Sequence, residues 1–203
     1  MTTTGTLPRS DPKLSEVARH VIQPDGIVAT GWPAVRETCA QLGVRFDGWQ
    51  DGTGRLITAK RSDGLYAADT VVISIPRQVG KTFLLGAIVF ALCIIHPGLT
   101  VVWTAHRFKT ARETFQAMQR FARRKRVAPH IETVRRGSGD EAVLFRNGSR
   151  VLFGARENGF GLGFSEHGVL VLDQPQRLSS KDKDDLLPTT NAAPNPMNML
   201  AAT

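Results

Sequence analysis

The chain has 203 residues, 41% of them apolar and 22% charged with a net charge of +8, which is typical of a folded globular domain with a sizeable core. Its two cysteines, Cys39 and Cys93, exclude a disulfide-stapled scaffold and favour a reducing, cytoplasmic setting. No secretory signal opens the sequence, and the longest apolar run, residues 83–95, is shorter than the roughly 20 residues of a membrane-spanning helix, so we expect no membrane partner.

The first third of the sequence gives only weak secondary-structure signals. Residues 1–48 are predicted to form a tail and two short helices, around 13–22 and 32–43. Residues 51–69 mix Gly and Asp with charged residues, which predicts loops around a short strand at 55–59.

From residue 70 onward, strand-like runs alternate with helical stretches. Residues 70–75 and 99–105 are apolar or β-branched on both faces, as in buried parallel strands, and residues 82–95 and 108–124 are predicted to be helices. The second helix has one apolar side, formed by Phe108, Ala111, Thr114, Phe115, Met118, Phe121 and Ala122.

The basic residues are concentrated in and after that helix. Between residues 107 and 150 there are twelve Lys and Arg residues against four Asp and Glu. Pairing such cations with phosphates releases counterions, so the excess favours a polyanionic partner. A solvated basic helix face is the alternative.

The second half of the chain predicts further strands. Residues 142–155 alternate on either side of Asn147-Gly148, which is the strongest short signal for a β-hairpin. A buried strand at 168–172 follows, with Asp173 at its carboxyl end, then a polar helix near 179–187 and an apolar segment, MNMLAA. The whole pattern predicts an α/β fold with a mostly parallel, helix-covered sheet and a β-hairpin insertion.

A candidate phosphate-binding loop follows the strand at 70–75. The general motif is G-x-x-x-x-G-K-[ST], and here Ile75 takes the place of its first glycine. We expect Lys81 to reach the β- and γ-phosphates and the hydroxyl of Thr82 to hold Mg²⁺. The backbone amides expected to surround the phosphates are those of Gln78, Val79, Gly80 and Lys81. A lysine at an ordinary helix start is the alternative.

Asp173 is the candidate acidic ligand for magnesium, since it ends a buried strand; a helix cap or turn residue is the alternative. In hydrolytic P-loop proteins a glutamate normally follows this aspartate and polarises the attacking water, but here Gln174 follows. A carboxamide orients water without accepting its proton, so ATP binding would persist while hydrolysis slows.

These motifs resemble one protein family. Residues 49–203 resemble the N-terminal ATPase domain of the large terminase subunit of tailed bacteriophages, the motor that packages DNA into capsids. Trp49-Gln50 resembles the family's Trp-Gln motif, and residues 76–82 resemble its variant phosphate loop, in which an arginine precedes the lysine and the leading glycine is often absent. Further stretches resemble the strand and helix after the loop, the approach to the metal-binding strand, and the start of the coupling motif: 101–115, 153–176 and 197–203.

The resemblance implies a P-loop NTPase domain of the ASCE (RecA-like) type over residues 49–203, with ATP and Mg²⁺ as cofactors. Gln50 would read adenine, and Thr203 would take the hydroxyl position of the motif that couples hydrolysis to movement. Arg77 would stabilise charge on the γ-phosphate, with a surface arginine as the alternative. The residues implied for phosphate, metal and catalysis are Lys81, Thr82, Asp173 and Gln174.

The implied function is an ATP-hydrolysing motor that moves double-stranded DNA into the capsid, in the host-cell cytoplasm. Its partners would be the portal, the small terminase subunit and further copies in a ring. Candidate contacts with DNA or a neighbouring subunit are Arg120, Arg123, Arg124, Lys125 and Arg126. The family's remaining ATPase strands, linker and nuclease domain are absent from the sequence, so we expect no nuclease activity. The acidic group at 182–185 is interpreted as a solvated helix face.

Four departures from the family pattern lie close to the expected chemistry. Gln174 replaces glutamate, Pro175 a small residue, Leu162 an arginine and Ala202 a glycine. They favour, as an alternative, a hydrolysis-impaired or degenerate fragment that binds nucleotide or DNA. Another helicase-like P-loop ATPase or a small-molecule kinase is a further alternative, although no kinase lid or acceptor pocket is evident.

Overall fold

A computed structural model describes residues 11–137, 139–156, 168–177 and 193–202. Four sequence expectations lie outside these ranges: the polar helix near 179–187, the acidic group at 182–185, and the positions of Leu162 and Thr203.

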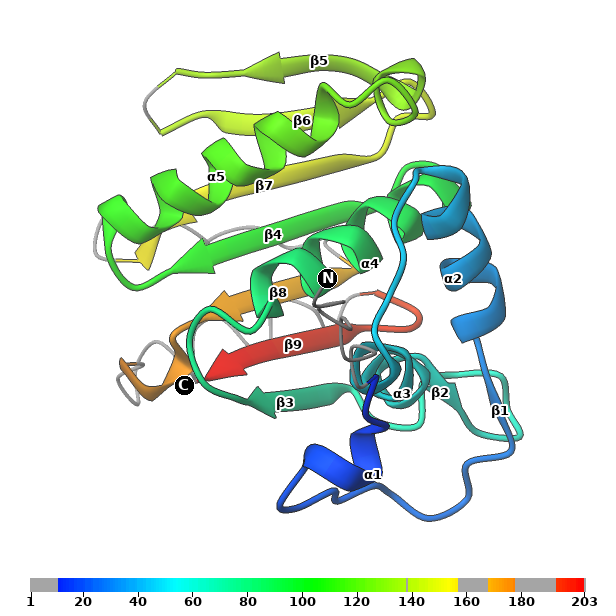
Figure 1. Cartoon of the computed structure of the whole chain (residues 1–203). Coiled ribbons are helices and arrows are strands. Elements are labelled where there is room, and N and C mark those ends of the chain that lie inside the picture. Colours follow the sequence, from blue (N-terminus) through cyan, green and yellow to red (C-terminus); the bar gives the residue numbers. More distant parts are fainter. Residues whose placement is uncertain (1–10, 138, 157–167, 178–192, 203) are drawn as a thin grey trace, which may run out of the picture.

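The main sheet has seven strands in the order β3-β9-β8-β4-β7-β6-β5 (Figure 1). Its strands are β3 (Thr70–Ser74), β4 (Thr100–Ala105), β5 (Ile131–Arg135), β6 (Glu141–Phe145), β7 (Arg150–Ala155), β8 (Val169–Asp173) and β9 (Met197–Ala202). The five strands from β3 to β7 in this order pair in parallel, and β6 and β5 are antiparallel additions. The predicted mostly parallel sheet is thus confirmed.

The predicted hairpin is β6 and β7, which pair antiparallel around a turn where Gly148 has a φ of +86°. Because β7 also pairs with β4, the hairpin extends the main sheet. Asn147 anchors the turn, since its Nδ2 donates to the carbonyl of Cys93 at 2.7 Å. β5, the edge strand beyond the hairpin, was not predicted from the sequence.

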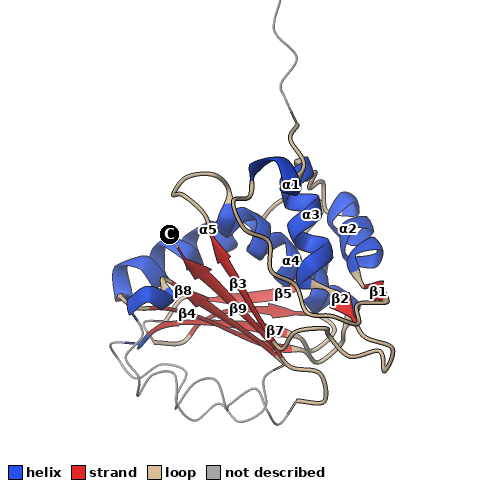
Figure 2. Ribbon diagram, turned by 90° about the horizontal axis from the view of Figure 1, so that it is seen from below, coloured by secondary structure: helices blue, strands red, loops and turns tan. Residues whose placement is uncertain are grey.

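The described α-helices lie on one side of the sheet (Figure 2). They are α1 (Leu14–Val17), α2 (Trp32–Gln41), α3 (Gly48–Ile57), α4 (Lys81–Ile95) and α5 (Phe108–Ala122). α4 is buried from Leu84 to Cys93, as an apolar helix on a sheet should be, and α5 buries the predicted apolar side from Ala111 to Ala122. None of the described helices is long and apolar enough to cross a membrane.

The predicted loops around a strand at 55–59 are wrong over the first part of residues 51–69, because Gly48–Ile57 forms α3. The strand β2 (Ala59–Lys60) comes two residues later; it pairs antiparallel with β1 (Ala29–Thr30), and Lys60 also bridges Tyr66. α3 begins with a capping box, in which Asp47 and Gln50 satisfy each other's backbone N–H groups. The predicted helix at 32–43 is confirmed as α2, whereas the one at 13–22 shrinks to the single turn of α1.

Tertiary packing explains why a glycine-rich segment is helical. Gly54 of α3 lies against the indole of Trp32, and a Cβ at this position would come within 2.2 Å of the ring. Trp32 and Ile57 belong to the same hydrophobic core as α4. The domain boundary at residue 49 stays a prediction.

We expect Gly54→Ala to lower the free energy of unfolding by about 1–3 kcal/mol, because the added methyl group overpacks the Trp32 contact. Urea unfolding measures the change. Gly137→Ala is the matched control, since its Cβ would meet only Asp140 at 3.8 Å, and its effect should stay within about 0.5 kcal/mol. Equal stability of the two variants would contradict the packing argument.

Candidate nucleotide-binding site

The candidate site lies where three neighbouring parallel strands end. β3 ends at Ser74, β9 at Ala202 and β8 at Asp173, and β9 lies between the other two (Figure 1). The register sets Ser74 against Ala202 and Asp173 against Ala201, so the three carboxyl ends are level. Strands lie about 4.8 Å apart, which separates the ends of β3 and β8 by roughly 10 Å. Ligands of open α/β sheets bind at such an edge.

The loop between β3 and α4 ends in a left-handed glycine at the N-terminus of α4, a backbone arrangement that favours anion binding. Gly80 caps α4 in a left-handed conformation, with a φ of +96°. A Cβ there would come within 3.1 Å of Gln50 Nε2, so both conformation and space favour glycine. The first N–H groups of α4 have no acceptor within the helix, and together with the helix dipole they favour a bound anion.

Two non-glycine residues in the described ranges have a left-handed backbone, and both belong to this edge. Gln78 has a φ of +64° in the loop, and Gln174 has a φ of +57° directly after β8. Such conformations cost about 1–3 kcal/mol and are held in place by their surroundings, often at functional sites. The N–H of Gln174 donates to the carbonyl of Ala201 at 3.1 Å, which ties this turn to β9.

Lys81 and Asp173 carry opposite charges across the end of β9. The Nζ of Lys81 donates to the carbonyl of Ala202. Burial lowers the pKa of Lys81, the carboxylate of Asp173 opposes this shift, and Arg77 adds to it. Burial raises the pKa of Asp173, and the charges of Lys81 and Arg156 oppose the rise together with a backbone hydrogen bond from Gln174. The lysine and the carboxylate therefore share one partly desolvated edge.

The remaining loop residues are more exposed to solvent than Lys81 and Asp173 or equally half-buried. Arg77, Gln78 and Val79 are exposed, and Thr82 is half-buried in the first turn of α4. The positive charge of Arg77 contributes to the lowered pKa of Lys81, so Arg77 is near the lysine. The structure therefore brings all the predicted loop residues to one edge with Asp173 and Gln174.

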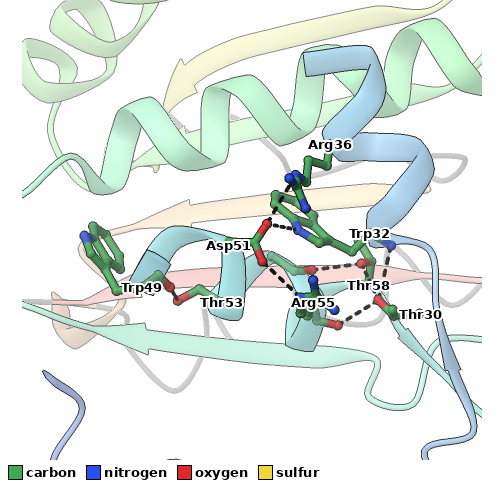
Figure 3. Close-up of polar contacts among 9 residues, drawn as sticks. Thr30, Trp32, Arg36, Trp49, Asp51, Thr53, Arg55 and Thr58 are labelled. Carbon is green, nitrogen blue, oxygen red and sulfur yellow. Dashed lines mark hydrogen bonds and ion pairs between the residues drawn. The ribbon is translucent and has the colours of Figure 1, made fainter. Parts of the chain in front are cut away.

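The structure also brings Gln50 to this loop. Gln50 is only 5% exposed, and its Oε1 accepts from the N–H of Asp47 at 3.0 Å, so its Nε2 is the amide atom that faces Gly80. The helix that carries it is anchored by Asp51, which accepts from Trp32 Nε1 at 2.8 Å and pairs with Arg55 and Arg36 (Figure 3). Neighbouring Trp49 accepts at its carbonyl from Thr53 Oγ1 (Figure 3).

The basic group lies apart from the loop. α5 starts beside the carboxyl end of β4 and runs back along the sheet for 15 residues, about 22 Å (Figure 1). Arg120 and residues 123–126 lie at its far end and are exposed. Arg124 also stacks over the Phe121 ring, with 5.0 Å between guanidinium carbon and ring centroid.

One further residue at the edge, Arg156, was not predicted from the sequence. Arg156, directly after β7, is 7% exposed, and its guanidinium donates to the carbonyls of Thr104 and Asp173 at 3.1 Å. The sequence gives no signal for it, because an arginine after a strand is ordinary until its tertiary partners are known.

The residues at this edge fit a magnesium nucleotide. A hydroxyl from Thr82 and a carboxylate from Asp173 are oxygen ligands of the kind that Mg²⁺ prefers, and Mg²⁺ commonly takes its remaining ligands from phosphates and water. Within the described ranges no group of three or more His, Cys, Asp or Glu residues forms a site for a metal without a substrate. The left-handed loop and Lys81 offer N–H and ammonium donors that suit phosphate oxygens.

Comparisons with known proteins agree with this fold. No protein-family model matches the sequence, and no curated protein matches it. The large terminase of bacteriophage HK97 superposes with a TM-score of 0.73 at 16% identity, over 86% of this chain and 38% of that chain. The large terminase ATPase domain of Thermus phage P74-26 superposes with a TM-score of 0.66 at 15% identity, over 90% of this chain and 70% of that chain. A mutant of the latter domain gives 0.65 at 16% identity, over 81% and 67%. The chain therefore has the fold of the ATPase domains of phage large terminases.

Proposed function

We propose that the chain is the ATP-binding and ATP-hydrolysing motor domain of a viral large terminase. The observation that carries the proposal is the meeting of a left-handed phosphate loop, Lys81 and Asp173 at one sheet edge of this fold. The chain spans 38% of the length of the HK97 terminase chain. We further propose that the domain couples ATP hydrolysis to the movement of double-stranded DNA into a capsid, in the host-cell cytoplasm. It would act there as a ring of copies, together with the portal and the small terminase subunit.

In this proposal the chain's own groups divide the work. The loop amides and Lys81 bind the β- and γ-phosphates, while Thr82 and Asp173 hold Mg²⁺. When bound, Mg²⁺ neutralises charge on the phosphates. Arg77 donates to the γ-phosphate as negative charge redistributes. Gln50 contacts adenine through Nε2, the amide atom that its capping bond to Asp47 leaves facing the loop.

In this proposal Gln174 sets the rate of ATP hydrolysis at the site. Its amide positions a water but does not take the proton, which a glutamate in the same place would accept. A domain that binds nucleotide and hydrolyses it slowly is therefore the second candidate function, favoured by this one residue. Thr203, outside the described ranges, keeps its proposed coupling role.

Titration with a fluorescent ATP analogue tests the shared core of both candidates. We expect saturable binding that Mg²⁺ strengthens, because the phosphates and the metal are held by neighbouring residues. If the chain binds no nucleotide, with or without Mg²⁺, both candidate functions are excluded.

DNA binding is expected to be weak and to fall steeply with salt. Arg123→Glu/Lys125→Glu should weaken binding to a duplex and reduce the slope of log affinity against log salt, by about one for each phosphate that the protein no longer neutralises. Fluorescence anisotropy between about 50 and 200 mM salt measures both.

The matched control for this pair is Arg19→Glu/Arg45→Glu, which makes the same change in net charge at exposed residues elsewhere. An equal loss of affinity in both double variants would mean that net charge alone matters. A wild-type affinity that does not change with salt would contradict phosphate binding by the basic group.

A further inference from the structure

Arg156 crosses the end of one strand to reach another. It follows β7, and the sheet order β8-β4-β7 places β4 between it and β8. Its Nη1 donates to the carbonyl of Thr104 on β4 at 3.1 Å. Its Nη2 donates to the carbonyl of Asp173 at 3.1 Å and approaches that of Gln174 at 3.4 Å.

These contacts explain why a charged group is stable there. A guanidinium on a residue that is only 7% exposed needs hydrogen bonds to offset its desolvation, and the carbonyls at the strand ends accept them. The planar fork of an arginine donates to both strands at once, whereas a lysine offers a single point charge. The side chain therefore fastens the ends of β7, β4 and β8 together.

The peptide of Gln174 is held from both sides. Its N–H donates to Ala201 on β9, and its carbonyl faces Arg156 Nη2. A left-handed φ of +57° in a non-glycine residue relaxes unless neighbouring groups hold it. These two contacts fix the direction in which both the carboxylate before this peptide and the amide side chain on it leave the backbone.

The same contacts continue to the phosphate loop. β9 accepts from Gln174 at Ala201 and from the ammonium group of Lys81 at Ala202. A line of hydrogen bonds thus runs along the sheet edge from Arg156 through the turn after β8 and the end of β9 to Lys81. We expect the loss of Arg156 to loosen the turn after β8 more than the phosphate loop, which lies at the other end of this line.

We propose that Arg156 is a positioning residue that fixes the turn after β8, so that Asp173 is aimed at the magnesium of a nucleotide held by Lys81. The inference rests on the proposed function. It predicts that Arg156 governs how much Mg²⁺ strengthens nucleotide binding, while the loop alone governs binding without Mg²⁺. The positive charge of Arg156 also opposes the rise of the Asp173 pKa that burial causes.

The test is titration of the whole chain with a fluorescent ATP analogue, with Mg²⁺ and in EDTA. For Arg156→Met we expect affinity with Mg²⁺ to fall about tenfold or more, the usual effect of losing a group that orients a metal ligand. Affinity in EDTA should change less than about twofold, since the phosphate loop is intact. Hydrogen exchange without nucleotide should be faster in the peptide that contains Gln174.

Arg150→Met is the matched control. Arg150 lies at the other end of the same strand, where its Nε donates to Thr100 Oγ1 at 3.0 Å, and its loss should leave both affinities unchanged. Arg156→Lys keeps the positive charge but not the planar guanidinium that donates to two strands. We expect it to lose part of the gain in nucleotide affinity that Mg²⁺ gives. This variant keeps the inference testable if Arg156→Met fails to fold.

The outcomes separate the two proposals. If the wild-type chain binds no nucleotide, the proposed function fails and this inference fails with it. If the wild type binds with a magnesium effect that a folded Arg156→Met retains, the inference alone is overturned. A full magnesium effect in Arg156→Lys would also overturn it, because charge without bridging would then suffice.

Discussion

Lys81→Ala is expected to reduce affinity for a fluorescent ATP analogue by about 100-fold or more, below the range of an ordinary titration. The lysine is the first residue of α4 and is half-buried, so its charge acts on phosphates with less screening than a surface charge. It would exchange the Ala202 carbonyl for phosphate oxygens. Alanine leaves the loop amides but removes the only cation among the loop residues that is partly buried.

The matched control is Lys109→Ala, which removes an exposed lysine from α5 and should leave affinity unchanged. Circular dichroism and thermal unfolding show whether each variant keeps the fold. Unchanged nucleotide affinity in a folded Lys81→Ala would mean that nucleotide does not bind at this loop.

Gln174→Glu is expected to raise ATP turnover by about 100-fold or more, because a carboxylate in this position can accept the proton of the attacking water. The backbone of residue 174 is already fixed by Ala201 and Arg156, so the new side chain should leave it in the same direction. Affinity for the nucleotide should change little, since Gln174 is not among the groups proposed to bind phosphate. A coupled phosphate-release assay measures turnover.

Gln176→Glu is the control for this prediction. It adds the same charge two residues further on, at a side chain outside the proposed site, and should leave turnover at the wild-type value. If Gln174→Glu binds nucleotide yet turns over no faster than wild type, a cause other than the missing carboxylate limits hydrolysis. That result would favour the slow nucleotide-binding domain as the function.

The sheet and its main helices could be predicted because their signals are local. β4 and β8 are apolar on both faces and α4 is apolar throughout, as buried elements must be. The hairpin followed from Asn147-Gly148. α3 was missed because its glycines argue against a helix, and the contact of Gly54 with Trp32 overrides that preference only in the folded chain.

β5 was missed because its sequence lacks the apolar pattern of a buried strand. Its sequence, IETVR, carries two charged residues and is mostly exposed, as suits an edge strand that only one neighbour pairs with. Its identity as a strand comes from pairing with β6, which the sequence does not display.

The candidate site could be predicted in its parts but not in its geometry. Gly-Lys-Thr after a β-branched run indicated the loop, and an aspartate at a strand end indicated the second anchor. The left-handed turn at Gln174 could not be foreseen, because glutamine has no preference for it and the hydrogen bonds that hold it come from β9 and from the residue after β7. For the same reason Arg156 emerged only from the structure.

The central claim is that Lys81 and Asp173 grip the same magnesium nucleotide across the end of β9. A crystal structure of the chain with a non-hydrolysable ATP analogue and Mg²⁺ tests it most directly. The account predicts Lys81 Nζ within about 3 Å of a β- or γ-phosphate oxygen. It also predicts Mg²⁺ about 2.1 Å from Thr82 Oγ1, with Asp173 bound to the ion directly or through one water. A nucleotide seated elsewhere, or a metal that Asp173 does not approach, would contradict the account.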